Sequence, residues 1–188
     1  LEHGGEIRFN TRMDDLILKG NKLSGIRTHT GDVIEGKALI LATGHSARDV
    51  FELLHRKNIL IEAKPFAMGV RVEHPQDLID RIQYHGTPRG DVLPAASYKL
   101  VEQVQGRGVY SFCMCPGGFI VPAATANDEL VVNGMSPSKR DNLFANSGIV
   151  VAIEPQDLKP YSKYGALAGL QYQREVEKAV WQAGGKDQ

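Results

Sequence analysis

The sequence predicts an α+β fold, in which an antiparallel meander and one buried strand precede a mostly antiparallel, mixed α+β region. Three observations predict it. Short strand-like segments separated by turn residues occupy the first 35 positions, and an unbroken apolar run follows at 38–44. Beyond that run, short strand patterns mix with helical patterns without a regular β–α alternation, which is typical of α+β proteins.

Composition limits the classes of function. The 188 residues suffice for one ordinary domain or two small ones, and 42% of them are hydrophobic. The 22 basic and 22 acidic residues cancel, so there is no electrostatic reason to expect nucleic acid or an anionic membrane as a partner. No apolar run approaches the roughly 20 residues of a membrane-spanning helix. With two cysteines, we expect a cytoplasmic protein without a disulfide framework.

The N-terminal segments predict a small meander. Turns containing Gly20 and Gly31 separate its later strands, and the strands are expected at 6–9, 15–19, 23–28 and 33–35. Residues 38–44 read Ala-Leu-Ile-Leu-Ala-Thr-Gly. They lack the alternation of a half-buried strand, so we expect a strand buried on both faces, as in a parallel sheet.

The remaining chain predicts three helices and six strands. Ser46 is expected to cap the first helix, Pro75 to begin the second, and apolar spacing places the third at 167–183. Alternation in the first of the strands puts Met68 on one face and Arg71 on the other. The six strands are expected at 66–73, 98–104, 109–113, 119–122, 130–133 and 147–154. The change in character near 44–49 predicts two domains, 1–48 and 49–188.

Several residues are candidates for binding or catalysis. Ala42, Thr43 and Gly44 end the apolar run, and small residues there let a ligand approach the backbone. The alternative is a tight turn without a ligand. His45 is a candidate acid or base, or else a residue that hydrogen-bonds the nearby backbone. Two arginines could hold a substrate carboxylate or phosphate, namely Arg48 and Arg71. The alternatives for Arg71 are that it lies in solvent or pairs across the sheet with neighbours of Glu73.

Three segments carry a resemblance to a known family. They read Gly-His-Ser-Ala-Arg-Asp at 44–49, Lys-Pro-Phe-Ala-Met-Gly-Val-Arg-Val-Glu-His-Pro at 64–75 and Ser-Phe-Cys-Met-Cys-Pro-Gly-Gly at 111–118. In this order they resemble a group of bacterial FAD-dependent dehydrogenases, often labelled NAD-utilising dehydrogenases. The Ala-Thr-Gly at the end of the apolar run also resembles a flavin-side motif of flavoproteins with two dinucleotide-binding domains. The resemblance covers essentially the whole chain.

The resemblance implies FAD beside Ala42, Thr43 and Gly44, a small-molecule substrate, and NAD(P)H as a possible electron donor. Such proteins hold the FAD pyrophosphate on a Gly-x-Gly-x-x-Gly turn. The sequence contains no such turn, because Gly106-Arg107-Gly108 lacks the third glycine. We therefore expect a middle portion, with part of the FAD domain at 1–48 and most of an inserted substrate domain at 49–188. Alone it should bind FAD poorly and be inactive.

Cys113 and Cys115 are the remaining candidates, two positions apart in a predicted strand, so their side chains are expected to point the same way. They could form a thiol redox pair, lie near the flavin, or act as small buried hydrophobic residues. No second Cys/His pair has zinc-ligand spacing, so no metal is expected. Pro116-Gly117-Gly118 follows as a turn able to approach a ligand.

Three hypotheses follow from the sequence. The chain is the central part of an FAD-dependent oxidoreductase, a stand-alone binding module for a small molecule or partner, or a thiol redox protein. The first is preferred because of the resemblance.

Overall fold

The computed structural model describes residues 4–44 and 46–186. The chain divides into two compact units, the first ending at Ile61 and the second beginning at Glu62. The sequence placed the division at 48/49 instead. The first helix therefore belongs to the first unit. Each unit is described below by itself.

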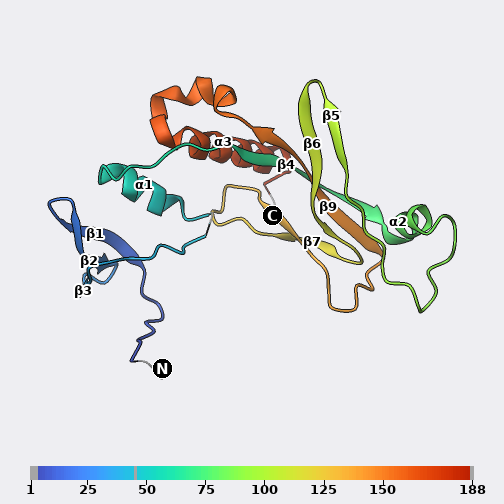
Figure 1. Cartoon of the computed structure of the whole chain (residues 1–188), viewed down its shortest axis with the longest axis horizontal. Coiled ribbons are helices and arrows are strands. Elements are labelled where there is room, and N and C mark those ends of the chain that lie inside the picture. Colours follow the sequence, from blue (N-terminus) through green and yellow to red (C-terminus); the bar gives the residue numbers. More distant parts are fainter. Residues whose placement is uncertain (1–3, 45, 187–188) are drawn as a thin grey trace. The chain divides into compact units, whose positions relative to one another are not determined.

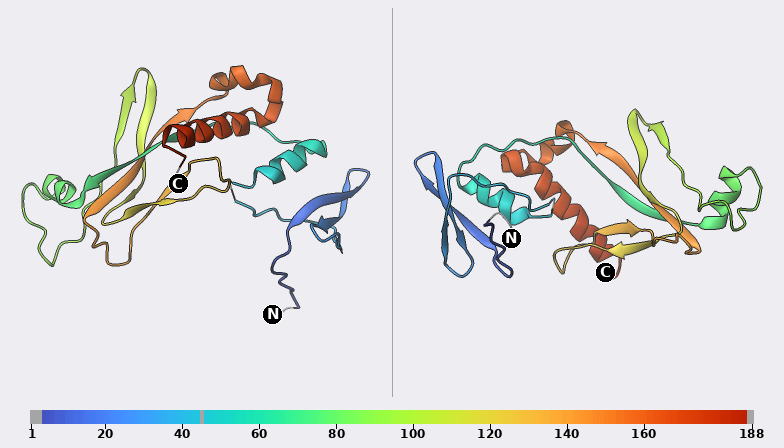
Figure 2. Two further views of the ribbon diagram at one scale, coloured as in Figure 1. Left: turned by 180° about the vertical axis from the view of Figure 1, so that it is seen from behind. Right: turned by 60° about the horizontal axis from the view of Figure 1, so that its bottom comes forward.

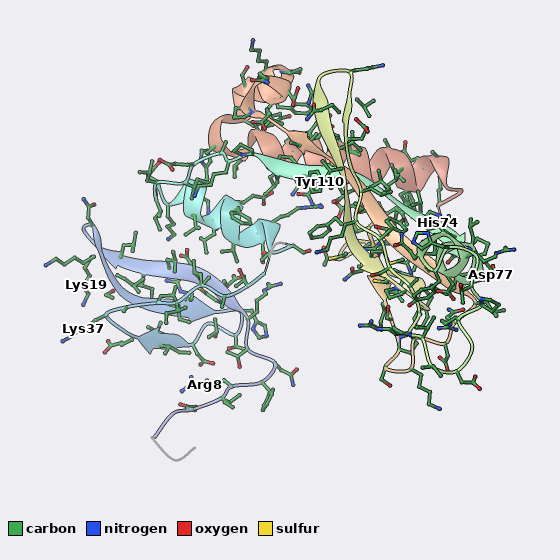
Figure 3. All side chains as sticks on the ribbon, turned by 45° about the vertical axis from the view of Figure 1, so that its right-hand side comes forward. Arg8, Lys19, Lys37, His74, Asp77 and Tyr110 are labelled. Atoms are coloured by element: carbon green, nitrogen blue, oxygen red, sulfur yellow. The ribbon has the colours of Figure 1, made fainter. Side chains whose placement is uncertain are left out.

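The first unit contains the expected meander. Its three strands form an antiparallel sheet in sequence order, and Leu16 is buried on it. Gly20 and Gly31 have φ of +59° and +91°, a left-handed conformation that glycine adopts without steric cost. Figure 3 labels Lys19 and Lys37 on this unit, which are both exposed. The strands are β1 (Met13–Lys19), β2 (Lys22–Thr28) and β3 (Val33–Glu35).

Helix α1 (Arg48–Arg56) closes the first unit. Ala47 precedes it and no side chain caps it, so the predicted Ser46 side-chain cap is wrong. The Ser46 carbonyl instead accepts a hydrogen bond from Arg48 N at 2.9 Å. Beyond the helix, Lys57 Nζ lies 2.8 Å from Asp15 Oδ1 of β1, and the hydrogen bond from Lys57 lowers the pKa of Asp15.

Two predicted strands of this unit are not formed. Residues 6–9 and 38–44 have no strand structure, and Ile40 is 91% exposed. A strand of a parallel sheet exists only where neighbouring strands take its hydrogen bonds. Among the described residues no strand pairs with 38–44. Residues 38–44 therefore have the apolar sequence of a buried strand, but no described strand covers them.

The second unit is built on a four-stranded antiparallel sheet of order β4-β9-β6-β5, accompanied by a separate β7–β8 hairpin (Figure 1). The prediction of a mostly antiparallel α+β region is thus confirmed. All six predicted strands exist, with bounds shifted by a few residues. They are β4 (Phe66–Pro75), β5 (Val101–Val104), β6 (Arg107–Cys115), β7 (Phe119–Pro122), β8 (Val132–Met135) and β9 (Phe144–Ile153).

Three helical segments accompany this sheet. They are α2 (Gln76–Gln83), which follows Pro75 directly, the 3-10 helix η1 (Pro155–Leu167) and α3 (Ala168–Ala183). Figure 2 shows η1 turning back from the end of β9 into α3. Among the described residues no helix is both long and apolar enough to cross a bilayer.

The helices cover one face of the sheet, here called the helix face. Phe66 and Met68 of β4 pack with Ile153, Leu158 of η1 and Ala168 of α3. At the other end of the same face, Ile79 of α2 packs with Ala96 and Ala145 of β9. Cross-strand partners share a face, and Phe66 pairs with Ile153 as His74 pairs with Ala145. The predicted orientation of Met68 is thereby confirmed.

Candidate functional site

The opposite face, here called the hairpin face, carries Arg71, Asn146, Gly148 and Phe112. Arg71 of β4 and Phe112 of β6 both pair with Gly148 of the intervening β9, so the three residues lie in a row on one face. Asn146 is two positions from Gly148 on the same strand and shares that face. The orientation predicted for Arg71, away from Met68, is therefore correct.

A β-bulge in β6 positions the next residues. Phe112 pairs with Gly148 but Cys115 pairs with Asn146, so β6 holds one extra residue there. Cys113 lies in this bulge with φ of +45°, a conformation uncommon for a residue other than glycine. The extra residue changes the alternation, so that Met114 packs into the core at the helix face while Cys115 reaches Arg71.

The Arg71 guanidinium is the centre of the cluster. Its Nη1 donates to Asn146 Oδ1 at 2.6 Å and to the Cys113 carbonyl at 3.1 Å, and it lies 3.9 Å from Cys115 Sγ. The Cys115 thiol donates to the Cys113 carbonyl at 3.3 Å. Sequence patterns indicate Arg71, Cys113 and Cys115 as separate candidate residues. The fold brings all three into contact.

The β7–β8 hairpin packs over this cluster. A Cβ placed on Gly134 of β8 would overlap both the Arg71 guanidinium and the Asn146 side-chain oxygen. Only glycine lets the β8 backbone come so close. Asn146 is completely buried beneath it, whereas Arg71 is half-buried.

The cluster has more hydrogen-bond donors than acceptors, and it contains no carboxylate among the described residues. Among the described residues each hydrogen-bond partner of Arg71 is neutral, and no carboxylate forms an ion pair with it, Glu73 on the same strand included. Asn146 Nδ2 is buried without a partner among the described residues. A half-buried charge and an unsatisfied buried amide both cost free energy.

The cysteines differ from their prediction in two respects. Both are free, and Cys113 is exposed while Cys115 is half-buried, so Cys113 is not a small buried hydrophobic residue. The expectation that both side chains point the same way assumed regular alternation, which the bulge interrupts. Sequence patterns carry no clear signal for such an inserted residue.

The Pro116-Gly117-Gly118 turn is closed to ligands in this structure, because all three residues are buried. Gly117 N donates to Gln76 Oε1 at 2.7 Å, and Gly118 N donates to the Phe144 carbonyl at 2.8 Å. A Cβ on Gly117 would overlap the Arg140 carbonyl. The glycines thus allow close packing of the protein's own backbone.

Gln76 belongs to a second polar cluster that sequence reasoning missed. Its Nε2 donates to Asp80 Oδ1 at 2.8 Å and to the Ala96 carbonyl at 3.0 Å. Asp80 Oδ1 also accepts from Ala96 N at 2.8 Å, and its Oδ2 lies 3.2 Å from Arg89 Nε. The i, i+4 spacing of Gln76 and Asp80 on one helix was the available signal. For Asn146 of the first cluster, the available signal was an amide side chain within the apolar strand β9.

The residues expected at the cofactor lie in the first unit. Ala42, Thr43 and Gly44 are exposed, and Gly44 has φ of +75° with open space around its Cβ position. This open backbone fits the approach of a flat cofactor ring. Arg48 begins α1. His45 lies outside the described residues.

No group of three His, Cys, Asp or Glu side chains within residues 4–44 and 46–186 is placed to hold a metal ion.

Comparison with known proteins identifies the family. Residues 65–188 match the family described as "FAD-dependent protein, C-terminal domain-like". The matched range begins one residue before β4 and contains both polar clusters. An uncharacterized protein of Clostridium beijerinckii is 46% identical over 184 residues, which cover 97% of this chain and 34% of that protein. This chain thus spans about a third of its relative's length. It belongs to the family of FAD-dependent proteins that share this C-terminal domain-like region.

Proposed function

We propose that this chain is the central part of an FAD-dependent oxidoreductase of the dehydrogenase type. The first unit contributes part of the flavin site, and the second unit contributes most of the substrate-binding domain. The observation that carries the proposal is the family match over 65–188. The alignment of 97% of the chain with a relative about three times as long further supports a place within a larger protein.

The flavin side of the proposal rests on residues 38–44. Ile40 and Leu41 are 91% and 38% exposed in a segment whose sequence is typical of a buried strand. Strands from the remainder of the full-length protein would cover them and complete a sheet. That sheet would end at the open backbone of Ala42, Thr43 and Gly44, where the flavin ring would lie. FAD, when bound, supplies two-electron chemistry by accepting a hydride from a reduced substrate or from NAD(P)H.

The pyrophosphate of FAD needs its own binding turn. No Gly-x-Gly-x-x-Gly occurs in this sequence, so the segments beyond this chain would supply that turn. Arg48 at the start of α1 remains a candidate for a phosphate or substrate carboxylate, and His45 for a proton-transferring group.

The test is a visible absorbance spectrum after incubation with FAD and desalting. It compares this chain with a chain extended in both directions along the full-length protein. We expect a yellow extended protein and a colourless chain. A colourless extended protein would contradict the flavoprotein function and leave the binding module as the better hypothesis. A yellow unextended chain would instead contradict the proposed division of the flavin site.

A matched pair of glycine variants tests the proposed place of the flavin. Gly44 and Gly20 both have positive φ, +75° and +59°, and nothing lies within 4 Å of either Cβ position. Gly44→Ala and Gly20→Ala therefore impose similar backbone strain. In the extended protein, only Gly44→Ala should lower the flavin retained. Equal retention in both variants would move the flavin away from Gly44.

A further inference from the structure

Within the described part of the chain, the hairpin face presents a cation without a counter-ion. Three other part-buried cations lie in ion pairs, namely Lys57 with Asp15, Arg89 with Asp80 and Lys178 with Asp128. The Arg71 guanidinium instead meets a carbonyl, an amide oxygen and a thiol. Those neutral partners all contact Nη1, so they fix the plane of the guanidinium and leave the donors on Nε and Nη2 available. A guanidinium held in this way is prepared for a bidentate acceptor.

The second unsatisfied group at this place is also a donor. Asn146 Nδ2 is buried without a partner, and the oxygen of the same amide already accepts from Arg71. Because both unsatisfied groups donate, the group that would satisfy them is an acceptor, and the positive charge favours an anion. Arg71 is the more exposed of the two, so an incoming anion meets the guanidinium first.

An exposed aromatic ring lies in register with the guanidinium. Phe112 is 57% exposed, and Gly148, which has no side chain, separates it from Arg71 across the sheet. The Arg71 side chain reaches across β9, because its Nη1 lies 3.1 Å from the carbonyl oxygen of Cys113, the residue after Phe112. A carboxylate bound to the guanidinium would therefore bring an attached planar ring close to Phe112. Contact with such a ring would cover apolar surface that Phe112 leaves in water.

We propose that the hairpin face binds a small planar carboxylate, whose anionic group pairs with Arg71 and whose ring lies against the exposed Phe112. This inference names the substrate class of the substrate-binding domain and so rests on the proposed function.

The test is binding of three probes to this chain, followed by two-dimensional ¹H–¹⁵N NMR. Benzoate has the ring and the charge, benzamide has the ring without the charge, and inorganic phosphate has the charge without the ring. Benzoate should shift the Arg71 Nε–Hε signal and the amides of Phe112 and Gly148. Benzamide should bind at least tenfold more weakly. Phosphate binding as strongly as benzoate would show an anion site alone and overturn the planar class.

Variants separate the two parts of the site. Arg71→Gln should weaken benzoate binding at least tenfold, and Phe112→Ala several-fold. The controls are Arg81→Gln on exposed α2 and Val92→Ala, at a position 92% exposed, and neither should change binding. Unchanged binding in Arg71→Gln would overturn the proposal.

Gly148→Ala provides a second route if Arg71→Gln fails to fold. Its Cβ would lie 3.1 Å from the Phe112 carbonyl oxygen and 3.7 Å from the Phe112 Cβ. The small shift that relieves this contact would move the Phe112 ring relative to the guanidinium. Benzoate binding should fall while the spectrum stays dispersed, and retained binding would count against the site. No flavin is present in this experiment, so its failure and a failure of the flavin test are distinguishable.

Discussion

Two polar clusters of the second unit use similar residues to opposite effect. At α2, Gln76 and Asp80 are buried, their amide and carboxylate groups are hydrogen-bonded, and Arg89 pairs with the carboxylate. At the hairpin face, Arg71 has no carboxylate partner and Asn146 Nδ2 has no acceptor among the described residues. Both clusters join segments distant in sequence.

The difference separates polar groups that hold the fold from polar groups prepared for a ligand. A buried network with every group satisfied fixes the position of its elements. In the α2 cluster, Gln76 ties the helix to Gly117 as well as to Ala96. A cluster with only donors left over retains a free-energy cost that an acceptor can remove. The predictions below test this distinction, from the largest expected effect to the smallest.

Asp80→Ala should produce the largest loss of stability. It leaves Gln76 Nε2 and Ala96 N with fewer acceptors and removes the partner of Arg89, which predicts about 3 kcal/mol of destabilisation. Urea denaturation measures it. The control is Asp77→Ala on the same helix, whose side chain is 72% exposed in its ion pair with Arg81 and should cost less than about 0.5 kcal/mol. Figure 3 shows Asp77 at the edge of the unit near His74. Equal losses would remove the distinction between buried network and surface pair.

Gly134→Ala should come next, at about 2 kcal/mol, because overpacking displaces neighbouring side chains. The added methyl group overlaps the Arg71 guanidinium and Asn146. In an Arg71→Ala background the cost should fall, because part of the overlap is gone. A double-mutant cycle from urea denaturation gives the coupling, expected to exceed about 0.5 kcal/mol. If the two losses of stability were strictly additive, the β8 backbone at Gly134 would not be in close contact with Arg71.

Arg71→Gln should alter stability by no more than about 1 kcal/mol, since the variant loses hydrogen bonds to neutral groups and also an unpaired charge. Differential scanning calorimetry of both proteins measures the change. A loss as large as that of Asp80→Ala would assign Arg71 to the structural class and weaken the proposed ligand site.

The exposed ion pair between Arg107 of β6 and Asp157 of η1 is a reference for an arginine that has a carboxylate partner, in contrast to Arg71. The hydrogen bond from Arg107 lowers the pKa of Asp157 from 3.8 to about 2. Because the pKa is lower in the folded protein, the stabilisation is complete above about pH 4 and is lost as the pH falls through 2. The difference in Tm between the protein and Asp157→Asn should therefore shrink from pH 5 to pH 2. A constant difference would contradict this origin.

Much of the fold could be predicted from local patterns. Turn residues and short apolar segments located every strand of the three antiparallel sheets, and β3 and β7 have the predicted bounds. The failures have physical causes. Residues 38–44 have the composition of a buried strand, but strand formation depends on neighbours that a local pattern does not contain. The bulge at Cys113 follows from pairing with β9, which fixes register from outside the strand.

The candidate site was predictable in part. Sequence patterns identified Arg71, Cys113 and Cys115 as candidates. Their contact depends on the strand order β4-β9-β6, which the sequence patterns did not predict. Asn146 was missed although an amide within an apolar strand was an available signal. Gly134 was missed because its importance arises only from packing of β8 onto the sheet. A glycine near a strand end carries no local sign of the side chain that it accommodates.

The bulge in β6 also has a consequence for comparing related sequences. The strand runs in one phase up to Phe112 and in the opposite phase from Met114 onward. Substitution at position 113 leaves both phases intact. Deletion of that one residue would close the bulge and place Met114 opposite Ser147, so Met114 and Cys115 would keep their present faces. The cluster would lose only the Cys113 carbonyl that accepts from Arg71. In an alignment, a one-residue gap here is therefore compatible with a retained contact between Arg71 and Cys115.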